Sequence, residues 1–178
     1  STFAAVTNAG TINLAADTSM ASLTQTAAAG KTSATAGLNV TGAIDNQAGS
    51  ITADSLSVAT TLTNADTITV TNAVAATGKT VNSKTITAGI LNLADVDNAA
   101  AGVIKSTATT KSVFGATDNK GEINLAGASE FGAVTNANKL TLTGDAVLAS
   151  LTQTAGTTTA GAGLTLSADS ATAGTVSV

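Results

Sequence analysis

The sequence predicts an all-β fold in which residues 1–178 form a single parallel β-solenoid of about ten coils of about 18 residues. Three observations predict it. Ile or Leu recurs at intervals of 17 to 19 residues from Ile51 to Leu140, each time within a short alternating segment. A long repeat places 15 identical residues in the 25-residue stretches 3–27 and 131–155. Aromatic residues make up 2% of the chain, so the core must be thin.

The composition excludes most catalytic and metal chemistry. The chain has no His, Cys, Tyr, Trp or Pro, and its seven basic residues are all Lys. Without His or Cys there is no imidazole base, thiolate nucleophile, zinc finger or disulfide. We therefore expect no enzyme activity, no catalytic residue, no cofactor and no bound metal. A conventional domain of this length carries about a dozen aromatic residues, so we expect an elongated core made by repetition.

The charge pattern argues against two classes of partner. Seven Lys and eleven acidic residues give a net charge of −4, and the charges are scattered along the chain. Nucleic acid binding needs clustered basic residues, and single-strand binding adds aromatic platforms, so we expect no nucleic acid partner. No stretch approaches about 18 consecutive apolar residues, so we expect no membrane insertion.

The repeating unit consists of an Asn, a few turn residues and an alternating strand whose middle residue is Ile or Leu. In Thr67–Val70, for example, the apolar residues face one way and the threonines the other. In chain order the units span residues 7–14, 45–53, 63–70, 81–88, 97–106, 118–125 and 135–142. Stacked about 4.8 Å apart, they give a dry ladder of inward aliphatic residues. The ladder residues are Ile12, Ile51, Ile68, Ile86, Ile104, Ile123 and Leu140.

Less regular segments complete the series of coils. The interval from Ile12 to Ile51 spans two periods, and residues 33–40 supply the coil between them, with Ala34 in the place of Ile. After the last unit, the series continues through residues 157–166 and 175–178.

A second alternating strand follows the Ile strand in many units. Its inward pairs are Leu38/Val40, Leu56/Val58, Leu91/Leu93 and Leu164/Leu166. Each coil therefore has at least two short strands. The offset of 128 residues between the copies of the long repeat equals seven coils, and the second copy begins near residue 131.

A column of asparagines precedes the Ile column by four to six residues. Asn tolerates the left-handed backbone conformation and bonds to neighbouring backbone groups, so we expect these residues at the corners of the coils. Their stacked amides could also bond from one coil to the next. The alternative is a row of glycan or ion sites. The column consists of Asn8, Asn46, Asn64, Asn82, Asn98, Asn119 and Asn136.

Other candidate features have structural and functional interpretations. Asp95, Asp97 and Asn98 form the one acidic cluster, which we interpret as a coil corner rather than a calcium or catalytic site, because catalysis also needs a charge stabiliser. No calcium-binding solenoid repeat occurs. The repeated word Thr-Gln-Thr, at 24–26 and 152–154, is a corner of fixed shape or a recognition loop. Phe3, Phe114 and Phe131 are expected to pack at a coil entrance or an end cap.

Paired threonines raise the alternative of an ice-binding surface. Thr67/Thr69 and Thr85/Thr87 flank the inward Ile, as a flat ladder of Thr would. Charged residues such as Lys105 and Glu122 occupy the same columns in other coils. We therefore interpret the threonines as solvated β-surface, which suits their branched side chains.

The pattern Asp-Asn-x-x-Gly-x-Ile-x-Ala-x-x-Leu-x-Val at Asp45–Val58 resembles the repeats of filamentous-haemagglutinin-like exoproteins and of bacterial autotransporter passenger domains. The resemblance extends over most of the chain, although the coils here are shorter and less regular, and Arg is absent. It implies a right-handed parallel β-helix that is secreted and projects from the cell surface with an adhesive role. The chain begins at Ser1 without a signal-peptide pattern, so we expect a removed leader or a longer surrounding protein.

The expected function is that of a structural segment or subunit of an extracellular bacterial surface fibre or adhesin. A rival within this class is a secreted subunit that polymerises end to end. A rival from another class is a β-helix that binds a ligand, either carbohydrate or ice. The expected partners are further coils of a longer chain or copies of the chain itself, stacked head to tail through Val176 and Val178, and a host or surface glycan.

Overall fold

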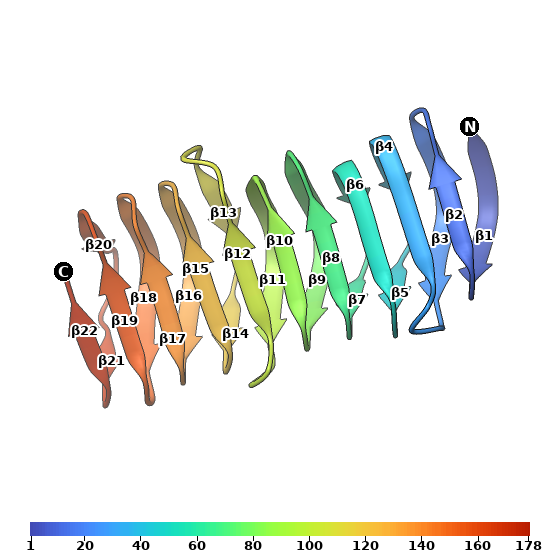
Figure 1. Ribbon diagram of the computed structural model, residues 1–178. Coiled ribbons are helices and arrows are strands. Elements are labelled where there is room, and N and C mark those ends of the chain that lie inside the picture. The colour runs from blue at the N-terminus through green and yellow to red at the C-terminus, as the bar shows by residue number, and fades with distance from the viewer.

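The alternation of small apolar and polar residues places most of the chain in short strands and none of it in a helix. The computed structural model describes all residues, 1–178, and the strands stack coil upon coil along one axis, with the N- and C-termini at opposite ends (Figure 1). Every pair of neighbouring strands is parallel, and one continuous sheet winds around the axis. The prediction of a single parallel β-solenoid of about ten coils is confirmed.

The strands are β1 (Thr2–Asn8), β2 (Thr11–Leu14), β3 (Thr18–Gln25), β4 (Lys31–Val40), β5 (Ile44–Asn46), β6 (Ser50–Val58), β7 (Leu62–Asn64), β8 (Thr67–Val70), β9 (Ala73–Asn82), β10 (Thr85–Ala88), β11 (Ile90–Asn98), β12 (Val103–Ser106), β13 (Ser112–Phe114), β14 (Thr117–Asn119), β15 (Glu122–Leu125), β16 (Ser129–Asn136), β17 (Lys139–Leu142), β18 (Ala146–Gln153), β19 (Thr157–Ala160), β20 (Leu164–Leu166), β21 (Ala171–Thr172) and β22 (Thr175–Ser177).

Each coil contributes three short strand segments, one more than the sequence pattern had established. We name the three resulting ladders by their inward residues. The isoleucine face contains the Ile column, the phenylalanine face contains the column from Phe3 to Leu166, and the amide face contains the Asn column. Long strands such as β4 and β11 turn a corner between faces, and the register shifts there between Ala34 and Gly37 and between Leu93 and Asp95.

The inward column of the isoleucine face follows the predicted ladder with one correction. Ile51, Ile68, Ile86, Ile104, Ile123 and Leu140 pair in succession and are fully buried. Between Ile12 and Ile51, however, the column is occupied by Thr32. The prediction that Ala34 takes this place is wrong, because Ala34 pairs with Leu14 and Ala53 in the next inward column.

The inward column of the phenylalanine face carries the largest side chains of the core. Phe114 and Phe131 lie on successive coils with ring centroids 4.6 Å apart and planes inclined by 14°. Such an offset stack fills the width of a core otherwise built from Leu, Val and Ala. Phe3 stands in the same column at the N-terminal end, where 45% of it is exposed. Two of the three aromatic residues therefore pack inside the stack and not at an end cap.

Coil length varies because the turns and corners vary in length, whereas the strand segments on each face stay in register. Successive amide-face partners are separated by as few as 16 and as many as 21 residues. Gly49 has a φ of 86°, and a Cβ there would lie 2.3 Å from the carbonyl oxygen of Gly30. Only glycine fits this turn, which brings two coils into close contact. The chain forms no helix of the length and hydropathy that crossing a bilayer requires.

Candidate functional site

The asparagines of the amide face point into the core. Asn46, Asn64, Asn82, Asn119 and Asn136 are fully buried, and Asn98 is 1% exposed. No residue other than glycine has a positive φ, so the expected left-handed backbone at these asparagines is wrong. They stand at the end of a strand in ordinary β conformation, and the corner begins after them.

The buried amides form a hydrogen-bonded ladder that runs along the rod. The Nδ2 of Asn64 donates to the Oδ1 of Asn82 over 2.9 Å, and the Nδ2 of Asn82 donates to the Oδ1 of Asn98 over 2.9 Å. The same bond joins Asn46 to Asn64, Asn98 to Asn119, Asn119 to Asn136 and Asn136 to Gln153, over 2.7 to 3.1 Å. All donors point toward the C-terminal end, so the ladder has a direction.

The same amide groups also hold the corners. The Nδ2 of Asn82 bonds to the carbonyl oxygen of Lys84 in its own turn over 2.9 Å, and that of Asn64 bonds to Asp66 over 2.8 Å. Both carbonyl oxygens also accept a backbone amide of the next coil, that of Lys84 from Val103 over 2.6 Å and that of Asp66 from Thr85 over 3.0 Å. The Asn side chain therefore adds a second hydrogen bond to each carbonyl and ties the turn to the strand end.

Two glutamines replace Asn in the ladder, and sequence reasoning missed their role. Gln25 and Gln153 pair with the Asn of the preceding coil and are buried. At both places the next residue of the Ile column is Thr, and its hydroxyl donates to the Gln Oε1, from Thr32 over 2.8 Å and from Thr158 over 2.5 Å. The longer amide reaches the Ile column, where Thr supplies both space and a donor.

The ladder is interrupted once, after the first glutamine. The Nε2 of Gln25 donates to the carbonyl oxygens of Gly30 and Ser50, over 3.1 and 2.7 Å. It therefore makes no bond to the next amide, and the buried Oδ1 of Asn46 has no partner. The first two coils are thus joined to the rest without the amide bond that links the coils after them.

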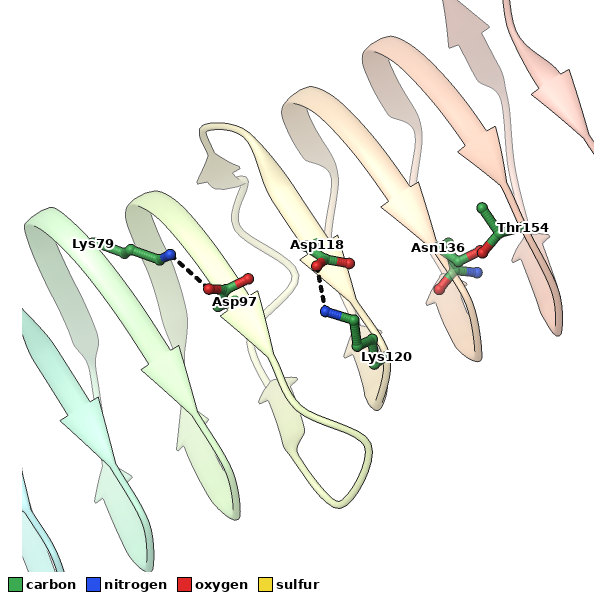
Figure 2. A network of polar contacts seen from close by, with 6 residues as sticks. All are labelled: Lys79, Asp97, Asp118, Lys120, Asn136 and Thr154. Atoms are coloured by element: carbon green, nitrogen blue, oxygen red, sulfur yellow. Dashed lines mark hydrogen bonds and ion pairs between the residues drawn. The ribbon is translucent and has the colours of Figure 1, made fainter.

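The outer surface of the amide face carries the predicted acidic cluster. Asp97 and Asp118 pair on successive coils, and the Nζ of Lys79 lies 2.6 Å from the Oδ2 of Asp97, as the Nζ of Lys120 does from the Oδ2 of Asp118 (Figure 2). The hydrogen bond and charge of Asp118 raise the pKa of Lys120, and Asp97 adds to this effect. The lysines therefore neutralise the acids, and the side chains remain exposed to water.

The three residues of the predicted cluster have different surroundings. Asp95 is exposed, and its Oδ1 accepts the backbone amide of Ala116 over 3.2 Å, which fixes the chain before β14. Asp97 is paired with Lys79, and Asn98 belongs to the buried ladder. No three ligating side chains gather at any point to hold a metal ion. The cluster therefore consists of two surface acids with structural contacts and one core amide.

The threonine rows of the isoleucine face are short. Thr67/Thr69 and Thr85/Thr87 occupy neighbouring coils beside Ser50/Thr52. The following coils place Val103/Lys105 and Glu122/Asn124 in the same columns, and the Nζ of Lys139 lies 3.0 Å from the Oε1 of Glu122. A polar patch of three coils is thus bounded by charged residues.

A shallow groove runs over the outer surface of the phenylalanine face near the N-terminus. It encloses about 480 Å³, and its walls include Asp17, Ser19, Asn39, Ser57 and Ala75. The Oδ1 of Asp17 accepts the backbone amide of Gly37 over 2.9 Å at one edge. The groove therefore offers hydroxyl and amide groups beside small residues such as Gly37 and Ala75.

The two ends of the rod expose apolar residues that belong to the inward columns. At the N-terminal end Phe3 is exposed and Val6 and Ile12 are half-buried. At the C-terminal end Leu166 is exposed, Val176 is half-buried and Val178 is 79% exposed. The strands at each end pair with a neighbour on one side, so each end presents a sheet edge together with an apolar surface.

The coil geometry is compatible with β-helix repeat proteins as a class, and it is the fold that relates this chain to them. No protein-family model matches the chain, and no curated protein or solved structure is significantly similar to it.

Proposed function

We propose that this chain is a structural segment of an extracellular bacterial surface fibre or adhesin, in which it acts as a stiff spacer. The observation that carries the proposal is the buried ladder, which runs without interruption from Asn46 to Gln153 and in which amides and aliphatic side chains repeat from coil to coil. Such a rod gains length with each added coil at a constant cross-section, about 4.8 Å per coil. The resemblance of the repeat at Asp45–Val58 to exoprotein repeats supports the extracellular location.

The surface chemistry supports a passive role for the sides of the rod. Four of its seven lysines form exposed ion pairs, such as Lys79 with Asp97 and Lys139 with Glu122, which are weak interactions and leave the charged groups hydrated. The carboxylates that a polysaccharide-cleaving enzyme would use have structural contacts here. The ordered interior is then the functional feature, because it sets the length and stiffness of the segment.

A second candidate function is the binding of a glycan. The groove on the phenylalanine face favours it, because Ser19, Asn39 and Ser57 present hydroxyl and amide groups that match sugar hydroxyls. Substituting Ser57→Leu would fill the groove, whereas Thr69→Leu on the isoleucine face is the matched control. Loss of binding to immobilised surface glycans in the first variant alone would support a glycan site.

The spacer function is tested by location and shape. Antibodies raised against the purified chain should label intact producing cells along surface fibres, and mild protease treatment of whole cells should remove the signal. X-ray scattering of the purified chain should give an elongated particle. Antigen confined to the cell interior would overturn the proposal.

A further inference from the structure

The long repeat places nearly the same strands at two positions in the stack, one inside it and one at its edge. Residues 131–155 lie beneath an earlier coil, and Phe131, Asn136 and Leu140 are 3%, 0% and 0% exposed. Residues 3–27 belong to the first coils. There Phe3, the counterpart of Phe131, is exposed, and Ile12, the counterpart of Leu140, is half-buried. The inner copy therefore shows what covers such an edge when it is occupied.

The covering coil contacts the inner copy through four columns. Phe114 stacks on Phe131, Ile123 pairs with Leu140, and Leu125 pairs with Leu142. In the fourth column the Nδ2 of Asn119 donates to the Oδ1 of Asn136 over 2.7 Å. An edge of this sequence thus accepts a parallel coil with three apolar residues and one hydrogen-bond donor.

The N-terminal edge is prepared for the same contacts. The Nδ2 of Asn8 donates to the Oε1 of Gln25 over 3.0 Å, as that of Asn136 donates to Gln153 over 3.1 Å. The Oδ1 of Asn8 accepts the backbone amide of Gly10 over 2.9 Å. A carbonyl oxygen has two lone pairs, so one remains for a donor from a further coil.

The C-terminal edge offers a coil of the matching kind. Leu166 continues the column of Phe3, and Val176 continues that of Ile12. Val178 comes two residues after Val176, as Leu14 comes two residues after Ile12, so the alternation of the strand directs it toward the column of Leu14. In the amide column the last coil has Thr172, whose hydroxyl is a donor but a shorter one than Asn. The two edges are therefore complementary in three apolar columns and partly matched in the polar one.

The strands of the two edges carry none of the charges that keep sheet edges apart. β1 and β2 at one end and β20, β21 and β22 at the other contain no charged side chain, and Asp169 lies in the turn between β20 and β21. Exposed strand edges of soluble proteins usually carry Lys or Pro to prevent pairing with another chain. Because all strands are parallel, a second copy moved along the axis meets the first with the same register.

We propose that the N-terminal edge, centred on Phe3, Asn8 and Ile12, is a docking surface for the C-terminal coil of a second copy of this chain. This inference rests on the proposed role as a rod segment and names its partner. The contact is heterologous, since different surfaces meet, and repeated translation does not close it into a ring. Copies then form an open filament in which the Ile column continues across each junction.

The test is sedimentation velocity of the full chain over a concentration series, with electron microscopy of the same samples. Wild type should associate, and its particles should be rods whose lengths increase in steps of one chain. Val176→Lys should abolish association at every concentration, because it places a charge in the junction. Val147→Lys is the matched control, because Val147 faces outward on an inner coil; it should associate as wild type does.

A gain-of-function variant tests the polar column. Thr172→Asn should let the last coil donate to the Oδ1 of Asn8, and one added hydrogen bond lowers the dissociation constant about five-fold. If both wild type and Thr172→Asn stay monomeric at every concentration, the docking proposal is overturned. The rod function would still be tested separately by surface labelling. Association that Val147→Lys abolishes and Val176→Lys leaves intact would also overturn it, because the contact would then be lateral.

Discussion

Asn82 lies between two amides of the same kind and has no access to water. It accepts from Asn64, donates to Asn98 and closes its own turn through Lys84. A single Asn thus serves two coils and a corner at once. Its side chain is polar inside an otherwise apolar core, which is tolerated because its hydrogen bonds are made within the stack.

Substituting Asn82→Ala should lower the free energy of unfolding by about 3 kcal/mol. The change leaves the buried Oδ1 of Asn98 without a donor, at a cost of about 1 to 3 kcal/mol, and it also removes the hydrogen bonds that Asn82 makes with Asn64 and Lys84, each worth about 1 kcal/mol. Urea denaturation measures the effect. Asn92→Ala is the control, because Asn92 is exposed on the phenylalanine face and should change stability by less than about 0.5 kcal/mol. Similar losses in the two variants would contradict the ladder.

The coupling of Gln153 to Thr158 is testable by a double-mutant cycle. Gln153→Asn alone removes the acceptor of the Thr158 hydroxyl, and Thr158→Ile alone crowds the Gln side chain, so each should destabilise the chain. The double variant recreates the pair Asn46 and Ile51, which has the same spacing of five residues. It should recover stability, with a coupling energy of about 0.5 to 3 kcal/mol from urea denaturation. Simple additivity of the two losses would refute the link.

At this scale the sequence showed the Asn column but not its burial. The spacing of Asn before Ile is compatible with a solvent-exposed corner and with an inward strand end, because turn residues follow in both cases. Gln25 and Gln153 were not recognised as ladder members, since the pattern was defined by Asn. The pairs Gln25 with Thr32 and Gln153 with Thr158 were a usable signal. In both cases Gln replaces Asn in the Asn column and Thr replaces Ile in the Ile column of the strand that follows.

The strands of each face act as elements whose register is set by their inward residues. The isoleucine face was predictable because Ile recurs with little variation between Ile51 and Leu140. It was misplaced in the irregular coil, where the isoleucine position holds Thr32. Counting along the sequence cannot detect a longer turn before a strand, and the turn after Gln25 is such a case. The third strand of each coil was not proposed because the inward residue two positions before the Asn varies among Leu, Ile, Val and Thr.

The cost of truncating an Ile should depend on where its strand lies in the stack. Ile68→Ala in β8 removes a fully buried side chain with a neighbour on each side, and should cost about 2 to 4 kcal/mol. Ile12→Ala in β2 makes the same chemical change in the first coil, where the side chain is half-buried, and should cost about half as much. Urea denaturation compares them. A larger loss at Ile12 would mean that the edge is covered in solution.

The whole molecule is a stack in which each coil contacts its neighbours, so the stability of a coil depends on its position in the stack as well as on its sequence. The period and the long repeat were enough to predict this architecture, because both express the same 18-residue unit. They could not predict where the ladder is interrupted. That feature depends on Gln25 turning its amide toward Gly30 and Ser50, which is a consequence of three-dimensional packing.

The two copies of the long repeat allow a prediction in which sequence is held nearly constant. Strand β1 pairs on one side with β3, whereas β16 pairs with β13 and β14 on one side and with β18 on the other. Amides of residues 3–8 should therefore exchange with solvent faster than those of residues 131–136, because local opening of an end coil requires less free energy. Hydrogen exchange followed by mass spectrometry at low protein concentration measures both segments in one sample.

Repeating the measurement at several protein concentrations shows whether the difference in exchange rate comes from the position of a strand in the stack or from its amino-acid composition. If copies stack head to tail, raising the protein concentration covers β1 with the coil that contains Val176, and protection should rise in residues 3–8 while residues 131–136 stay unchanged. The Val176→Lys chain should keep fast exchange in residues 3–8 at every concentration. Equal protection of the two segments in dilute wild type would show instead that the stack opens as one unit, because an end strand and an inner strand would then share a single opening free energy.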